Sequence, residues 1–286
     1  MAKALRWFGY FIGLVFVLVT LAVAWIWIAS SMALGSTHEG VAEKLVQPSA
    51  AQLADGPRQL QVLGCVSCHG EGLRGDILFS EPNVADLYAP NLTLIAATAS
   101  DQQLARAIRQ GIGTDGRPLF AMPSAQYARL SDGEVAALVA AIRALPAGGK
   151  QVAPINVGPI GRLGLATGKF PSQPEEVERF RANMPASVGK EYEVGRKLVM
   201  VNCAECHGPA LKGGEPKPGL KAPDLMVAGV YDLPEFKRLM RTGVATGNRK
   251  LEMMSDIARR DFSHYTDAEL AAIHAYLQER AMKTSQ

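Results

Sequence analysis

GCVSCHG at residues 64–70 and NCAECHG at residues 202–208 are the two segments that decide how this chain folds. Together they hold all four cysteines of the 286-residue sequence, and in each segment a histidine directly follows the second cysteine. A random placement of four cysteines would rarely produce this pattern even once. The two segments therefore indicate two related sites in one chain.

The sequence around each segment repeats as well. Ala89-Pro90-Asn91-Leu92 is answered by Ala222-Pro223-Asp224-Leu225. The stretch LARAIRQGIGTDGRPLFAM (104–122) aligns without gaps with FKRLMRTGVATGNRKLEMM (236–254), and LSDGEVAALVAAIRAL (130–145) aligns with YTDAELAAIHAYLQER (265–280). We therefore expect two copies of one folding unit, with Met122 and Met254 at equivalent positions.

Helical signals dominate both copies. Ser131 with Glu134, and Thr266 with Glu269, have the S/T-x-x-E spacing that satisfies free N–H groups at the start of a helix. Apolar residues then recur at helical spacing, whereas the alternation typical of strands is scarce. We also expect helices over 101–110 and 232–242. The sequence thus predicts an all-α fold with long loops, in which a large apolar cofactor completes each small core.

The N-terminal segment is suited to a membrane. Trp7–Ala29 is almost entirely apolar, and a helix needs roughly 20 such residues to cross the hydrocarbon layer. Lys3 and Arg6 precede it, so the positive-inside rule keeps the N-terminus in the cytoplasm and exports the rest. A cleavable signal peptide ending near Ser31-Met32-Ala33 is the alternative, although its apolar core would be unusually long.

These signals divide the chain into five parts. We expect, in order, an N-terminal membrane anchor (1–36), a linker (37–50), a first domain (51–146), a Pro/Gly-rich linker over the surface (147–188) and a second domain (189–286). The net charge of +3 at pH 7 is mild and gives no reason to expect nucleic acid binding.

The Cys-x-x-Cys-His spacing predicts covalent attachment of a c-type haem. Two cysteines on one helical turn can each form a thioether with a haem vinyl group, and the adjacent histidine then faces the iron. We expect one haem at Cys65, Cys68 and His69, and a second at Cys203, Cys206 and His207. A zinc site would have to join pairs from separate repeats, and a redox-active dithiol would need a βαβ context that is missing.

A sixth iron ligand has to come from elsewhere in each unit. Met122 lies in a Phe-Ala-Met-Pro turn before the last helix, and the gapless repeat places Met254, rather than its neighbour Met253, at the same position. Thioether sulfur is a soft ligand that suits haem iron and raises its reduction potential. Met253 remains the reserve for the second site, and His264 is a minor alternative.

Arg109 and Arg241 recur at equivalent positions after the middle helix of each unit. Each guanidinium could pair with a haem propionate, or it could be an ordinary arginine near the negative end of a helix dipole. Tyr88 and Asn91 could also bind a propionate. The residues alone leave these alternatives open.

Both units resemble class I cytochrome c domains, the all-α fold that surrounds one haem. The resemblance covers about 50–146 and 188–283. The first unit, with YAPNLT, IRQGIGTDGRPLFAMPS and LSDGEVAALVAAIRALP, is similar to cytochrome subunits of membrane-bound alcohol and gluconate dehydrogenases. The resemblance implies His69 with Met122, and His207 with Met254, as the axial ligand pairs of two covalently bound haem c groups.

The expected function is electron transfer rather than catalysis. We expect a single-pass protein of a bacterial inner membrane, with periplasmic haem domains that carry electrons between a redox donor and a redox acceptor. A dehydrogenase, a quinol-oxidising complex or a terminal oxidase would be the partner. The alternatives are an electron-transfer subunit of a dehydrogenase or oxidase complex and, less well supported, a dihaem enzyme such as a peroxidase or a thiosulfate-oxidising cytochrome.

Overall fold

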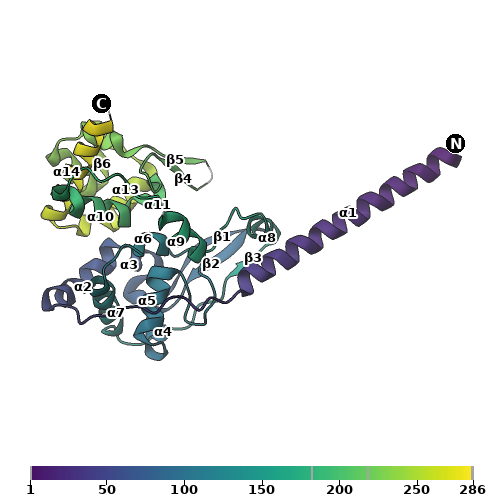
Figure 1. Cartoon of the computed structure of the whole chain (residues 1–286), viewed down its shortest axis with the longest axis horizontal. Coiled ribbons are helices and arrows are strands. Elements are labelled where there is room, and N and C mark those ends of the chain that lie inside the picture. Colours follow the sequence, from purple (N-terminus) through teal and green to yellow (C-terminus); the bar gives the residue numbers. More distant parts are fainter. Residues whose placement is uncertain (1, 182, 218, 285–286) are drawn as a thin grey trace.

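Helix α1 (Ala2–Gly35) projects away from the rest of the molecule (Figure 1). The computed structural model describes residues 2–181, 183–217 and 219–284. Within these ranges α1 is the one helix that is long and apolar enough to cross a membrane. Its apolar side chains are exposed along most of its length, which is how a helix looks when its partner is lipid rather than a protein core.

The first repeat folds into a small helical domain, called domain 1 here. Ser100 and Ser131 close capping boxes at the starts of two of its helices, so these helices begin where the sequence predicts. In chain order its elements are α2 (Ala50–Val62), α3 (Cys65–His69), η1 (Glu71–Leu73), β1 (Asp76–Glu81), β2 (Ala85–Ala89), α4 (Leu92–Thr98), α5 (Asp101–Gln110), α6 (Ser124–Tyr127) and α7 (Asp132–Arg143).

The second repeat forms domain 2 with the same helical order. The Thr266 N–H donates to the Glu269 carboxylate at 2.7 Å, and the Glu269 N–H donates to the Thr266 hydroxyl at 3.2 Å, which completes the second predicted capping box. Its elements are η2 (Lys190–Tyr192), α10 (Glu193–Asn202), α11 (Ala204–His207), β4 (Gly214–Lys217), β5 (Leu220–Ala222), η3 (Leu225–Val230), α12 (Leu233–Thr242), β6 (Val244–Ala245), η4 (Thr246–Asn248), β7 (Arg249–Lys250), α13 (Glu252–Arg260), η5 (Phe262–His264) and α14 (Asp267–Thr284).

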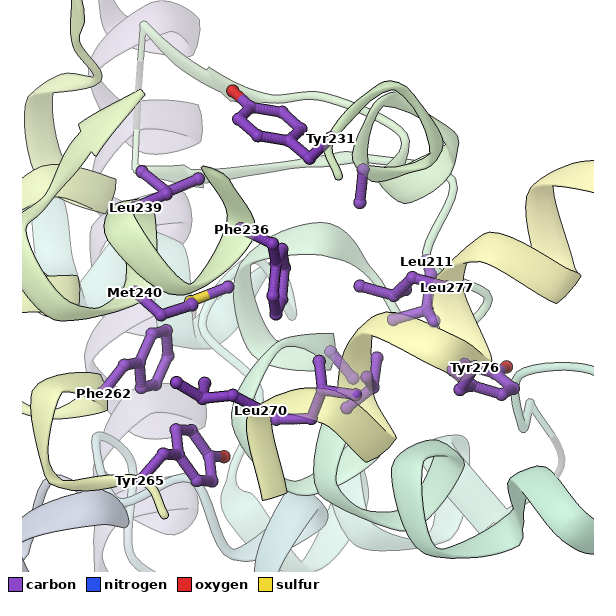
Figure 2. Packing of buried hydrophobic residues seen from close by; sticks show 14 of the residues in the cluster. Leu211, Tyr231, Phe236, Leu239, Met240, Phe262, Tyr265, Leu270, Tyr276 and Leu277 are labelled. Carbon is purple, nitrogen blue, oxygen red and sulfur yellow. The ribbon is translucent and has the colours of Figure 1, made fainter. Parts of the chain in front are cut away.

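In each domain the last helix packs across the helix that precedes the cysteine motif, α7 on α2 and α14 on α10. The crossing is close because a glycine lies at the contact. A Cβ on Gly56 would lie 3.0 Å from the Ala141 Cβ, and a Cβ on Gly195 would lie 2.0 Å from the Ala272 carbonyl oxygen. Figure 2 shows how the core of domain 2 fills the space around α14 with large apolar side chains, including Phe236, Leu270 and Tyr276.

The prediction of an all-α fold holds for the bulk of both domains, which are mostly helical. The described residues also contain small antiparallel sheets that the sequence did not predict. Strands β1, β2 and β3 (Asn156–Val157) form one sheet, while β4 with β5 and β6 with β7 form two-stranded pairs. They are short loop segments held by a few backbone hydrogen bonds.

The two expected linkers are more ordered than their composition suggests. Residues 147–188 contain α8 (Pro159–Ala166) and α9 (Gln173–Arg181), which pack on α1 and α6 respectively. Proline at the first position of α8 fits a helix start, since its missing N–H has no helical partner there. In the linker 37–50, the Val41 N–H donates to the Gln110 side chain at 2.8 Å, so this segment is attached to α5.

Domains 1 and 2 contact each other through two pairs of elements, and each domain contributes the helix before its cysteine motif to one of them. Helix α2 of domain 1 packs on η5 of domain 2, while the equivalent helix α10 of domain 2 packs on α6 of domain 1. Val62 at the end of α2 is 1% exposed and belongs to the core of domain 2. Val201 on α10 is 5% exposed and belongs to the core of domain 1. Each domain therefore inserts one side chain into the core of the other.

Candidate functional site

Each Cys-x-x-Cys-His motif forms a single helical turn directly after a longer helix. Motif 1 is helix α3, and in motif 2 Cys203 is followed by helix α11. The Cys68 N–H donates to the Gly64 carbonyl at 3.1 Å, and the His207 N–H donates to the Cys203 carbonyl at 2.9 Å. The turn places the two cysteines and the histidine of each motif together, and all four thiols are free of disulfide bonds.

The two histidines are oriented by the same kind of contact. Nδ1 of His69 lies 2.8 Å from the Pro90 carbonyl oxygen, and Nδ1 of His207 lies 2.8 Å from the Pro223 carbonyl oxygen. A carbonyl oxygen can only accept, so Nδ1 carries the proton and Nε2 keeps a free lone pair. This is how metal-bound histidines are usually held. Burial lowers the pKa of both histidines and favours the neutral ring that binds a metal.

Pro90 and Pro223 were not singled out as functional positions from the sequence. The signal was nevertheless present, because they belong to the repeated Ala-Pro-Asn/Asp-Leu blocks at 89–92 and 222–225. What the sequence does not reveal is that the proline contributes its backbone oxygen. A contact made by a backbone carbonyl does not depend on a particular side chain, so it leaves no pattern in the amino-acid sequence.

The two predicted methionines pack against the same apolar clusters as the motifs. Met122 contacts the core of domain 1 together with Cys65, and Met254 contacts the core of domain 2 together with Cys203. Met253 is half-buried and is not part of that packing. The two positions differ locally, since Met122 lies in a loop whereas Met254 lies in the first turn of α13, where a loop was expected.

The remaining predicted candidates have other roles. Arg109 pairs with Glu43 and with Asp132, at 2.8 Å to the latter, and Arg241 binds Asp267 at 3.1 Å. Both arginines thus attach the middle helix to the first residue of the last helix. The Asn91 amide donates to the Gly148 carbonyl at 2.8 Å while its oxygen caps α4.

Two of the other histidines, His264 and His274, contact protein groups of domains 1 and 2. His274 Nε2 lies 2.9 Å from the Tyr231 carbonyl oxygen and its ring packs beside Phe236. The side chain of His264 is exposed on η5, its backbone N–H donates to the Asp261 carbonyl at 3.2 Å, and its backbone carbonyl accepts from Arg58 at 2.9 Å.

The environment of the cysteines favours neutral thiols. Burial raises the pKa of Cys65 and Cys203 to about 12 and that of Cys206 to about 11. Zinc sites and redox-active dithiols need thiolates, which burial disfavours. Within the described residues, no group of three or more His, Cys, Asp and Glu side chains is placed to hold a metal ion.

A c-type haem fits this donor set. Each domain offers two unpaired thiols on one turn, a neutral imidazole with a free Nε2, and a thioether sulfur packed against the same cluster. Imidazole with thioether is a known axial pair of cytochromes c, and the thiols supply the attachment to the vinyl groups.

Both motifs lie close to the domain interface. Ser67 and Glu205 occupy the same position, one residue before the second cysteine. The Ser67 hydroxyl donates to the Asp261 carboxylate of domain 2. Besides burial, the charge of Glu205 raises the pKa of Cys68 in domain 1. The Glu205 side chain still reaches solvent, but the surrounding protein atoms raise its own pKa.

The fold and the donor set are those of cytochrome c domains, and comparison with known proteins agrees. The model of the family described as "Cytochrome c" matches residues 192–281. The model described as "Cytochrome C oxidase, cbb3-type, subunit III" matches residues 51–140. The chain therefore contains two cytochrome c domains, a class that binds haem c.

A curated relative aligns with most of the chain. The chain is 24% identical over 255 aligned residues to the cytochrome c subunit of the quinone alcohol dehydrogenase of Gluconobacter oxydans (strain 621H). The alignment covers 75% of this chain and 52% of the relative, so the chain spans about half the length of that protein.

Proposed function

We propose that the chain is a membrane-anchored dihaem cytochrome c that carries electrons between redox partners at the outer face of a bacterial inner membrane. The observation that carries the proposal is the matched pair of histidine contacts. In both domains a proline carbonyl accepts from Nδ1, which leaves Nε2 as the nitrogen able to bind a metal. We assign His69 with Met122, and His207 with Met254, as the two axial pairs.

Haem supplies an iron that changes between the ferric and ferrous states, and the residues of the chain prepare the rest. The four cysteines would attach the two haems through thioethers, the neutral imidazoles of His69 and His207 would bind the iron, and the sulfurs of Met122 and Met254 would supply the further iron ligands. With these protein ligands bound, the iron would offer no coordination site to a substrate. This supports an electron carrier over a dihaem peroxidase or a thiosulfate-oxidising enzyme.

The domain interface gives the electron a path within one chain. Because Ser67 and Glu205 bring the two motifs to the same interface, electrons can pass from one domain to the other without diffusion of either domain. The apolar α1 keeps this unit at the membrane, where a donor and an acceptor would meet it at a raised local concentration.

A second candidate function is that of an electron-transfer subunit within a dehydrogenase or oxidase complex. The relative from Gluconobacter oxydans, which is itself such a subunit, favours it. Purification of the chain from native membranes in a mild detergent separates the two possibilities. A stable complex with a dehydrogenase or oxidase supports the subunit, whereas a chain that migrates alone and still reduces added partners supports the carrier.

Haem stoichiometry tests the proposal itself. The purified chain should contain two covalently attached haems, measured by intact mass and by the absorbance of the pyridine complex. The variant with Cys203→Ala and Cys206→Ala should keep one haem, on domain 1. A wild-type chain with one haem, with bound zinc or with disulfides would contradict the assignment.

A further inference from the structure

Helix α8 is attached to the end of α1 that lies nearest the globular domains (Figure 1). The guanidinium of Arg162 lies 3.8 Å from the centre of the Trp27 ring, and its Nη1 donates to the Ser30 hydroxyl at 3.0 Å. Ser30 is fully buried by this contact, although almost every other residue of α1 is exposed. The contact fixes α8 at one height along α1.

That height is the expected boundary of the bilayer. The segment Trp7–Trp27 measures about 30 Å at ~1.5 Å per helical residue, which matches the thickness of the hydrocarbon layer. Trp25 and Trp27 then lie at the outer edge, where tryptophan side chains gather in membrane proteins. Since Arg162 stacks on Trp27, α8 lies at the same level as this edge.

The surface of α8 that faces away from the protein is apolar. Ile160 and Leu163 are one helical turn apart and are 57% and 45% exposed. Phe170, in the turn that follows, is 48% exposed. Arg162 and Lys169 lie beside these side chains and have stems long enough to keep their charges among lipid headgroups. Three large apolar side chains gathered on one short segment at this height fit lipid better than water.

Helix α8 is also joined firmly to domain 1. The Gly158 N–H donates to the Val84 carbonyl at 2.9 Å, and the Ile160 N–H donates to the Asn83 carbonyl at 2.9 Å. Both acceptors lie at the turn between β1 and β2, and β3 adds a third strand to that sheet just before α8. The position of α8 is therefore coupled directly to the position of domain 1.

We propose that α8 lies in the interfacial layer of the outer leaflet, with Ile160, Leu163 and Phe170 against lipid. This inference rests on the proposal that α1 spans the membrane. A lipid surface is favoured over a protein partner because the membrane height is already set by α1, through Arg162. The consequence is that the membrane fixes the orientation of domain 1, which is then not a freely swinging unit on a flexible tether.

Photolabelling by lipid tests this directly. The full-length haem-loaded protein is placed in nanodiscs of phosphatidylcholine and phosphatidylglycerol, together with a phospholipid that carries a diazirine near its glycerol group. After illumination and trypsin digestion, the peptide Leu163–Lys169 should carry lipid adducts. The matched control is the exposed domain 2 peptide that contains Val230, which is 76% exposed but far from α1, and it should carry none.

Two further measurements keep the outcomes distinct. The variant Leu163→Asp should lose the α8 adducts while its haem spectrum stays unchanged. A second phospholipid, with the diazirine at the end of the acyl chain, should label α1. Labelled α1 with unlabelled α8 overturns the inference alone, whereas an unlabelled α1 overturns the anchor. Protein crosslinks to α8 in native membranes, without lipid adducts in nanodiscs, also overturn it and identify a protein partner.

Discussion

Glu134 and Glu269 occupy equivalent positions in the two domains, and each forms a salt bridge with a basic residue of the other domain. Both are the glutamates of the capping boxes that start the last helices. Arg58 on α2 reaches Glu269 with two hydrogen bonds, of 2.8 and 2.9 Å. Lys197 on the equivalent helix α10 pairs with Glu134. Each of the two glutamates thus caps the start of a helix and also joins the two domains.

The variant Arg58→Gln should weaken the joint between the domains without unfolding either. The pair is only partly exposed and doubly hydrogen-bonded, so we expect a loss near the upper end of the ~0.2–1 kcal/mol that is typical of such pairs. Calorimetry of the full chain should show the transitions of the two domains moving apart. Arg117→Gln, which removes an exposed pair with Asp115 inside domain 1, is the control and should leave them in place. An unchanged profile for Arg58→Gln would mean that the apolar contacts alone hold the domains together.

The stability of the contact between the domains should fall at low pH only. Burial is the largest single effect and raises the pKa of Glu134 and Glu269, but the hydrogen bonds and charges of Lys197 and Arg58, together with the hydrogen bonds of the capping residues Ser131 and Thr266, outweigh it, so the pKa of both carboxyls lies below the usual value. A lowered pKa stabilises the folded joint above the ordinary pKa of about 4.3, and this stabilisation is lost as pH falls through the lowered value.

Titration followed by calorimetry checks this dependence. Stability of the joint should be flat from neutral pH to about 5 and should fall below about 4. The double variant Arg58→Gln, Lys197→Gln keeps both capping boxes and should lose most of this acid dependence. A joint that weakens between pH 5 and 7 would point to histidine titration instead.

The packing of the methionines predicts different effects for two neighbouring positions. Met254→Ala should remove the sulfur ligand of the second site, lower the reduction potential of that haem and open it to added cyanide or imidazole. Met253→Ala should change neither property, because its side chain is not packed with the core that contains Cys203. Potentiometric titration with optical detection separates the two haems. Equal effects of the two substitutions would remove the basis for choosing Met254.

The two close helix crossings should differ in their tolerance of a methyl group. At Gly195 the added Cβ would meet a backbone carbonyl at 2.0 Å, which cannot move without shifting α14. At Gly56 the nearest atom is a side-chain carbon at 3.0 Å. Gly195→Ala should therefore destabilise its domain by about 1–3 kcal/mol, and Gly56→Ala by less. Thermal unfolding of the two variants provides the comparison, and the reverse order would contradict the packing.

The sequence was informative where local patterns determine structure. Ser131 and Thr266 predicted the starts of two helices because a capping box is satisfied within four residues. The repeat also paired Met254 with Met122, and Met254 packs against the same apolar cluster as Cys203. Both inferences needed only spacing along the chain.

The features that the sequence did not predict depend on contacts between residues that are far apart in the sequence. Pro90 acts through its carbonyl, and Arg109 pairs with Glu43 and Asp132, for which the helix end gave no indication. Helix α8 is short and rich in glycine, and it is stabilised by α1 and by the turn after β1 rather than by its own composition. No local pattern could show that a segment after domain 1 returns to α1.

We propose that each domain holds one haem between a histidine and a methionine. Electron paramagnetic resonance of the oxidised full-length protein, with spins counted against the polypeptide, checks this assignment. Two low-spin ferric signals per chain and no high-spin signal are expected. One spin per chain, or a high-spin ferric haem with an open coordination site, would contradict it and would favour an enzyme.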